Sequence, residues 1–172
     1  NPNLLASWTA LKTASDSTKI QATPTIHEID NPESEAREAE STQVRGFNPI
    51  LGDDFADITG QFHDVPQKIM KKIRAYNSEI ALSVYLVNEA KQIIGIADDN
   101  ETATTFRGIP VQSFYVGQKK LGGRNDVDKN MIKWRMLPNW SDELYVVTPT
   151  DFNPLPTDLT PDHTSSKNPS PF

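Results

Sequence analysis

The three histidines are the first residues whose chemistry could serve a metal site or a catalytic base. His27, His63 and His163 lie far apart in the chain, and none has a second histidine at the i+3 or i+4 spacing that helical metal sites use. A catalytic triad can gather distant residues, but the chain contains no Gly-x-Ser-x-Gly motif to supply a nucleophile. His63, which precedes Asp64, is therefore interpreted as a turn residue rather than a general base. We predict no catalytic residue.

The segment from Gly117 to Arg124 has the glycine spacing of a phosphate-binding loop. Four residues separate Gly117 from Gly122, and an apolar run precedes them. A phosphate loop needs Lys and then Ser or Thr after the second glycine, whereas Gly123 and Arg124 stand there. We interpret the segment as a loop between strands and predict no nucleotide cofactor.

Two acidic clusters carry the carboxylate oxygens that calcium prefers. The clusters are Asp53, Asp54 and Asp57, and Asp98, Asp99 and Glu101. Neither follows the spacing of a calcium loop, and Asp also favours turns because it bonds its own backbone. We therefore predict turns at both places and no metal site.

Three aromatic residues could form a platform for a sugar ring. Trp134, Trp140 and Tyr145 lie close together in the chain, and large aromatic faces suit such contacts. Trp134 alternates with core positions, however, so a place in the core is the simpler interpretation. A carbohydrate-binding module remains the alternative function.

Composition and charge limit the classes of partner. The chain has 172 residues, no cysteine, and 23 acidic against 17 basic side chains. This length corresponds to one domain, and the absence of cysteine excludes disulfides and thiolate chemistry. The net charge of −6 would repel nucleic-acid phosphates, and the short basic runs at 71–74 and 119–124 are interpreted as solvated faces. No apolar run approaches the ~18 residues of a membrane helix, so we predict neither a nucleic-acid nor a membrane partner.

One amphipathic helix is predicted from 65 to 76. Asp64 can cap its N-terminus and Pro66 suits its first turn, while residues 77–78 end it. The apolar face recurs at helical spacing and consists of Val65, Ile69, Ile73 and Tyr76. Such a helix packs on a sheet.

Alternating apolar residues predict a series of strands after this helix. The expected strands are 80–87, 92–97, 111–116, 131–137 and 145–148, with turns at 88–91 and 98–100. Strand 80–87 is apolar on both faces and is therefore expected to be central. The residues expected in the core are Ile69, Ile73, Leu82, Val84, Leu86, Ile94, Phe114 and Trp134. The fold class predicted is α+β and mainly β, an antiparallel sheet, sandwich or barrel-like core with one packed helix.

Polar arms are expected at both ends of this core. We predict an N-terminal arm at 1–43, a core at 44–148 and a proline-rich C-terminal arm at 149–172, where six of 24 residues are proline. Residues 32–40 are expected to be a short exposed helix or disordered. A polar, proline-rich segment buries too little to order itself, so neighbouring subunits would have to hold the arms. The expected contact residues are Leu4, Trp8, Leu11, Phe152, Leu155, Leu159 and Phe172.

The run from 80 to 116, the loop at 117–128 and the segment from Trp134 to Pro154 resemble bacteriophage virion proteins. A helix packed on a strand-rich core is similar to the tail-tube and head-decoration proteins of tailed phages. The resemblance implies a non-enzymatic structural subunit located in the virion, without cofactors. Its partners would be copies of itself and other virion proteins.

Overall fold

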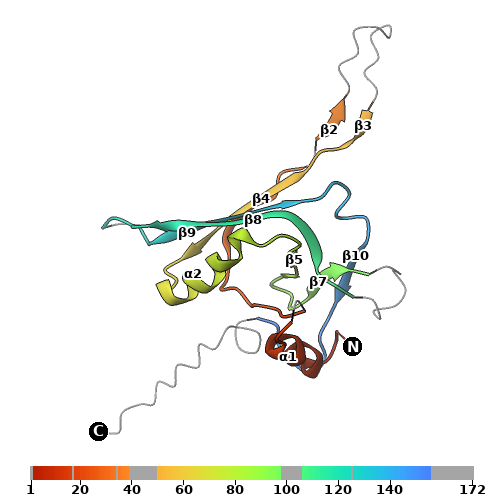
Figure 1. Ribbon diagram of the computed structural model, residues 1–172, viewed down its shortest axis with the longest axis horizontal. Helices are drawn as coiled ribbons and strands as arrows, with labels where there is room; N and C mark the ends of the chain where they lie inside the picture. The colour runs from red at the N-terminus through yellow and green to blue at the C-terminus, as the bar shows by residue number, and fades with distance from the viewer. Residues whose placement is uncertain are drawn as a thin grey trace, which may run out of the picture.

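A five-stranded antiparallel sheet forms the centre of the molecule (Figure 1). The computed structural model describes residues 2–16, 18–33, 35–38, 50–97, 106–124 and 126–155. The strands, in spatial order, are β1 (His27–Asp30), β4 (Ala56–His63), β9 (Lys129–Met136), β8 (Ile109–Lys120) and β5 (Ser83–Val84). The sheet is curled and one helix packs on it, which confirms the predicted fold class of a mainly β protein.

One face of this sheet holds the core. β4 alternates strictly between buried and half-buried residues, and so does most of β9. Ile58 lies opposite Trp134 and Phe62 opposite Asn130, and all four are at most 3% exposed. Trp134, predicted for the core, shares this buried face with Ile132 and Met136.

Helix α2 (Gln67–Arg74), continued by the 3₁₀ turn η1 (Ala75–Ser78), covers the core face. Met70 and Ile73 are its buried residues, at 0% and 1% exposure. The side chain of Asn77 anchors η1 to β8, because its amide both donates to the carbonyl of Val116 at 3.0 Å and accepts from the amide of Val116 at 2.9 Å. The helix was predicted correctly, but its cap was not. Asp64 makes no side-chain cap, and its backbone N–H donates instead to the carbonyl of Asp128 at 2.8 Å.

A second sheet of three strands lies beside the first. Its order is β10 (Leu144–Val147), β7 (Ile93–Ile96) and β6 (Leu86–Val87), all antiparallel. The predicted turn at 88–91 joins β6 to β7, and Asn88 closes it by accepting from the amide of Gln92 at 3.0 Å. Strand 145–148 was thus predicted correctly as a strand, but it belongs to this second sheet.

The segment 80–87 is not a central strand. It divides into β5 and β6, which are edge strands of two different sheets. Ile80 is 90% exposed, and Ala81 adopts a left-handed backbone conformation with φ 66°. Both faces of the segment are apolar because it passes from one sheet to the other. Among the eight residues predicted for the core, Ile73 and Trp134 are buried, whereas the other six are half-buried.

Residues 36–38 are a strand and not the predicted helix or disordered segment. β2 (Ala36–Glu38) pairs with β3 (Ile50–Asp53), and this hairpin points away from the body of the molecule (Figure 1). Pairing with residues 12 to 17 positions further along the chain overrides the weak local helix signal. The predicted start of the core at 44–47 and the turn at 98–100 lie outside the described residues.

We expect Ile73→Ala to lower the free energy of unfolding by about 2–5 kcal/mol, because it leaves a cavity in the buried contact between α2 and the sheet. Ile80→Ala is the matched control, and its effect should stay within about 0.5 kcal/mol because that side chain is already in water. Urea unfolding of both variants measures the difference. Equal losses at the two sites would contradict the packing described for α2.

Candidate functional site

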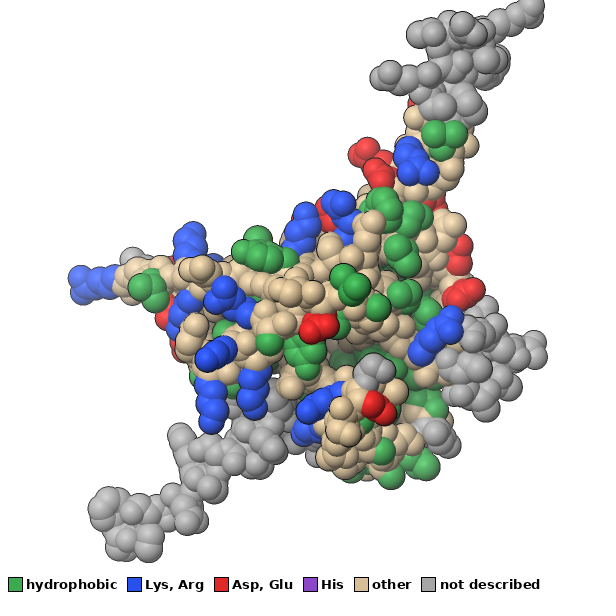
Figure 2. Space-filling model, in the orientation of Figure 1, with side chains coloured by type: hydrophobic (Ala, Val, Ile, Leu, Met, Phe, Trp, Pro, Cys, Tyr) green, Lys and Arg blue, Asp and Glu red, His purple; other side chains and the backbone are tan. Residues whose placement is uncertain are grey.

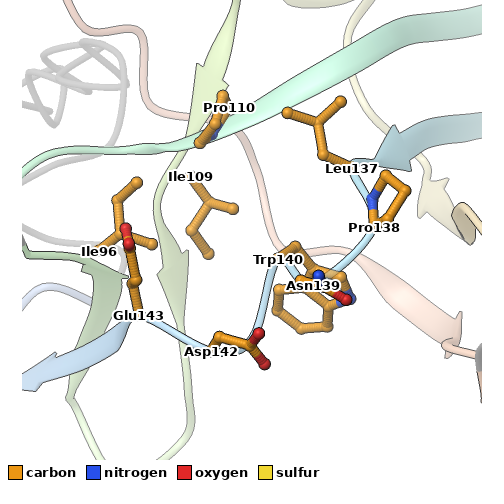
Figure 3. A pocket seen from close by; sticks show the side chains of 9 residues that line it. All are labelled: Ile96, Ile109, Pro110, Leu137, Pro138, Asn139, Trp140, Asp142 and Glu143. Atoms are coloured by element: carbon orange, nitrogen blue, oxygen red, sulfur yellow. The ribbon is translucent and has the colours of Figure 1, made fainter. Parts of the chain in front are cut away.

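A pocket of about 370 Å³ lies where β9 ends and the chain turns towards β10 (Figure 3). Its apolar wall is made by Ile96, Ile109, Pro110, Leu137 and Pro138. Its polar and aromatic side is made by Asn139, Trp140, Asp142 and Glu143. Strands β7 and β8 and the loop after β9 therefore build one site from three parts of the chain. Its size lies near the lower end of the ~300–1,000 Å³ typical of ligand pockets.

Successive tight turns shape the loop that carries the polar side. The amide of Trp140 donates to the carbonyl of Leu137 at 3.3 Å, and the amide of Asp142 donates to the carbonyl of Asn139 at 3.1 Å. Asn139 is left-handed with φ 59°, a conformation that Asn tolerates better than most residues. These turns bring an aromatic ring and two carboxylates to the same rim.

The rim of the pocket is negative. Asp142 and Glu143 are both exposed, and neither forms an ion pair with a residue that the structure describes. In Figure 3 the carboxylate of Asp142 points towards Trp140 and that of Glu143 lies beside Ile96. An apolar wall next to two free carboxylates and an indole suits a ligand with an apolar stem and a positive end.

A cluster of ion pairs lies on the outer face of the central sheet, the face opposite the core. Asp57 binds Arg135 with two hydrogen bonds of 2.7 and 2.8 Å and lies 3.0 Å from Nζ of Lys133. The hydrogen bond from Arg135 is the main cause that lowers the pKa of Asp57 far below its usual range. The same bond raises the pKa of Arg135. Arg135 also lies over the ring of Phe55, 5.8 Å from its centroid.

The acidic clusters considered for calcium do not assemble in the described part of the chain. Asp57 is neutralised by its two cations, Asp53 lies in the β2–β3 hairpin, and Asp54 accepts from the amide of Phe55 at 2.8 Å. Residues 98–101 lie outside the described residues. Within the described ranges, no group of three or more side chains could hold a metal ion.

His27 and His63 are brought together by the pairing of β1 with β4. Their rings stack with centroids 4.5 Å apart and planes inclined by 10°. Nε2 of His63 lies 3.5 Å from a carboxylate oxygen of Glu28 and forms no hydrogen bond within the described residues. Their separation along the chain hid this pair from sequence analysis. His163 lies outside the described residues.

The glycine-rich segment is not shaped to hold phosphate. Gly117 lies inside β8, and the amide of Gly122 donates to the carboxylate of Asp128 at 2.9 Å. Lys119 pairs with the same carboxylate at 2.7 Å. The groups that could have faced a phosphate thus bind an acidic side chain of the same loop.

The three aromatic residues considered for a sugar platform do not share a surface. Trp134 is 3% exposed on the core face of the sheet. Tyr145 is half-buried, with its ring 6.1 Å from that of Phe106. Trp140 alone lines the pocket.

The described N-terminal residues pack on their own chain. Helix α1 (Leu5–Thr13) buries Trp8 to 3% exposure, and the indole meets the rings of Tyr85 and Phe106 edge-on at 5.0 and 6.2 Å. Trp8 therefore has almost no surface to offer a neighbour. Leu4 is 41% exposed and Leu11 is half-buried.

The C-terminal segment holds the start of α1. The carboxylate of Asp151 accepts from the amide of Leu5 at 3.0 and 3.2 Å. A negative charge at this position stabilises the N-terminal end of the helix. Phe152 and Leu155 are half-buried, whereas Leu159 and Phe172 lie outside the described residues. The proposed contacts of these four residues with neighbours remain predictions.

No protein-family model matches the chain, and no curated protein or solved structure is significantly similar to it. None of the described helices is long and apolar enough to span a membrane.

Asp57→Asn should lower the free energy of unfolding by about 1 kcal/mol at pH 7, because it removes the charge that Arg135 and Lys133 face. The folded pKa of Asp57 lies below the usual 3.8, so the unfolded chain takes up the proton first as the pH falls. The stabilisation is therefore fully present above about pH 4 and falls progressively as the pH drops below it towards the folded pKa. Urea unfolding at pH 7 and near pH 2 measures the change, with Asp53→Asn as the control that should show no such dependence. A gap between wild type and Asp57→Asn that is as wide near pH 2 as at pH 7 would rule out this account.

Trp8→Ala should lower the free energy of unfolding of the dispersed chain by about 3–5 kcal/mol, because the indole fills a site between two other rings. Leu4→Ala, at a side chain that is 41% exposed, should lower it much less. Chemical unfolding at low protein concentration compares the two. If both variants were as stable as wild type, α1 would be a free arm after all.

Proposed function

We propose that the chain is a non-enzymatic structural subunit of a virus particle and assembles with copies of itself and with other virion proteins. The observation that carries the assembly proposal is the β2–β3 hairpin. Its described residues are all exposed and form a sheet of their own, pointing away from the core. The virion part of the proposal rests on the resemblance of residues 80–154 to phage structural proteins.

A two-stranded hairpin is at best marginally stable in water, because it buries little apolar surface to offset the ordering of its backbone. Ile50 and Leu51, in β3, are 68% and 57% exposed. Burying one such side chain on a partner contributes about 1.5–3 kcal/mol. A neighbouring subunit that covers both would offset much of the cost of holding the hairpin in place.

Additional apolar side chains are exposed on the outer face and at the end of the central sheet. Tyr115 and Met131 are each 49% exposed, and Leu121 is 75% exposed. Contiguous exposed apolar surface often marks an interaction site. The hairpin and this face therefore favour assembly over an isolated monomer.

We expect the wild-type chain to self-associate and Ile50→Asp with Leu51→Asp to weaken that association about tenfold or more, because a charge cannot enter the apolar contact. Ile80→Asp is the matched control, since Ile80 is 90% exposed but lies outside the hairpin. Sedimentation velocity over a concentration series measures the association. Immunogold labelling of purified particles from cells that carry the gene tests the virion location.

A wild-type chain that remains monomeric up to about 1 mM would lack even a contact of about 4 kcal/mol and would overturn self-assembly. For the carbohydrate-binding alternative, the described structure leaves one candidate site, the pocket beside Trp140. A rise in melting temperature with a glycan, lost in Trp140→Ala, would favour that alternative.

A further inference from the structure

We propose that the pocket after β9, with Asp142 and Glu143 on its rim, receives Lys71 and Lys72 of α2 from a second copy of this chain. This inference rests on the proposed function, because it names the partner and the geometry of the self-contact. Two adjacent lysines would meet two adjacent carboxylates in a head-to-tail arrangement.

The chemistry of the pocket matches a lysine side chain. Lysine has an apolar stem of four carbons and a compact positive end, so it buries the stem on apolar surface and places the ammonium beside acceptors. Pro110 and Leu137, which are both exposed, provide the apolar wall, while Trp140 provides an aromatic ring to which a cation is attracted. The two rim carboxylates, without ion-pair partners in the described structure, supply the opposite charge.

The donor surface is the outward face of α2. Lys68, Lys71 and Lys72 follow the i, i+3, i+4 spacing, so they lie on one side of the helix, and all three are exposed. None of them forms an ion pair with a described residue. Figure 2 shows Lys and Arg side chains gathered over α2 and the β8–β9 end of the molecule. The outward face of α2 thus carries positive charges and no acidic side chain. By contrast, most basic residues of the central sheet form ion pairs.

The fold places the two surfaces at different ends, so the contact must join two molecules. Strand β9 runs for eight residues, or roughly 26 Å, from the β8–β9 loop to the pocket. The segment leading into α2 is tied to the loop end, through the bond between Asp64 and Asp128. The pocket begins at Leu137, beyond the opposite end of the strand. Figure 1 shows α2 and the turn before β10 on different sides of the molecule.

A contact between two different surfaces is heterologous. Repetition of such a contact produces a closed ring if the rotation closes and a filament if it does not. The hairpin contact proposed above can coexist with it, because β2 and β3 line neither surface.

Charge reversal on each side tests the proposal. Asp142→Lys with Glu143→Lys makes both surfaces positive, and Lys71→Glu with Lys72→Glu makes both negative. Each variant alone should therefore associate about tenfold or more weakly than wild type in sedimentation velocity. An equimolar mixture should recover association, because each surface then finds its opposite. Recovery would also show that both variants fold.

The controls carry the same change in net charge elsewhere. Lys19→Glu with Lys91→Glu, and Asp30→Lys with Glu33→Lys, alter exposed residues outside both surfaces and should leave association unchanged. If the reversed variants associate as tightly as wild type, or if the mixture does not recover, the pocket contact is wrong while the hairpin assembly stands. If wild type itself does not associate, the proposed function fails as well.

Discussion

The pairing of β4 with β9 is the constraint on which the rest of the structure depends. The two strands run antiparallel in unbroken register from Ala56 opposite Met136 to His63 opposite Lys129. Because side chains alternate between faces, a shift of one residue would place Gln61 and Asp57 in the core. The same register sets Asp57 directly opposite Arg135 on the outer face. Apolar contacts on one side and an ion pair on the other therefore favour a single alignment.

This alignment also gives the molecule its two ends. One end holds the β8–β9 loop and the start of the α2 segment, and the other holds the pocket beyond Met136. Lysines on α2 and carboxylates at the pocket rim form no ion pair with any residue that the structure describes. Surface charges at such separation interact little within one molecule, since salt screens them over about 8–10 Å. They remain available to a partner, where close approach makes them effective.

The exposed surfaces favour contact sites other than the terminal arms expected from the sequence. The N-terminal helix is tied to the core by Trp8 and to the C-terminal segment by Asp151. The described terminal residues thus contribute to the fold of their own chain. The β2–β3 hairpin projects from the body and its described residues are all exposed, which makes it the stronger candidate for contact with a neighbour.

The sequence by itself determined the elements whose local pattern reports the core. Helix α2 and strands β7, β9 and β10 were predicted within about two residues of their observed bounds, because apolar spacing of 3.6 or 2 residues shows which side faces inward. Strand β8 was predicted only over 111–116, and residues 117–120, which were interpreted as part of a loop, continue it. β4 was not predicted, because Gly60 and the polar residues on its outer face weaken the apolar alternation that indicates a strand. The mainly β class and the buried face of β9 followed from these patterns alone.

Only the tertiary structure decided which distant residues meet. Trp8 joins Tyr85 and Phe106, and His27 stacks on His63, through pairings that no local period encodes. β2 exists because β3 offers it hydrogen bonds. The pocket likewise combines β7, the start of β8 and the loop after β9. Local periodicity shows that a residue faces inward, but the side chain that it meets depends on the folded path of the whole chain.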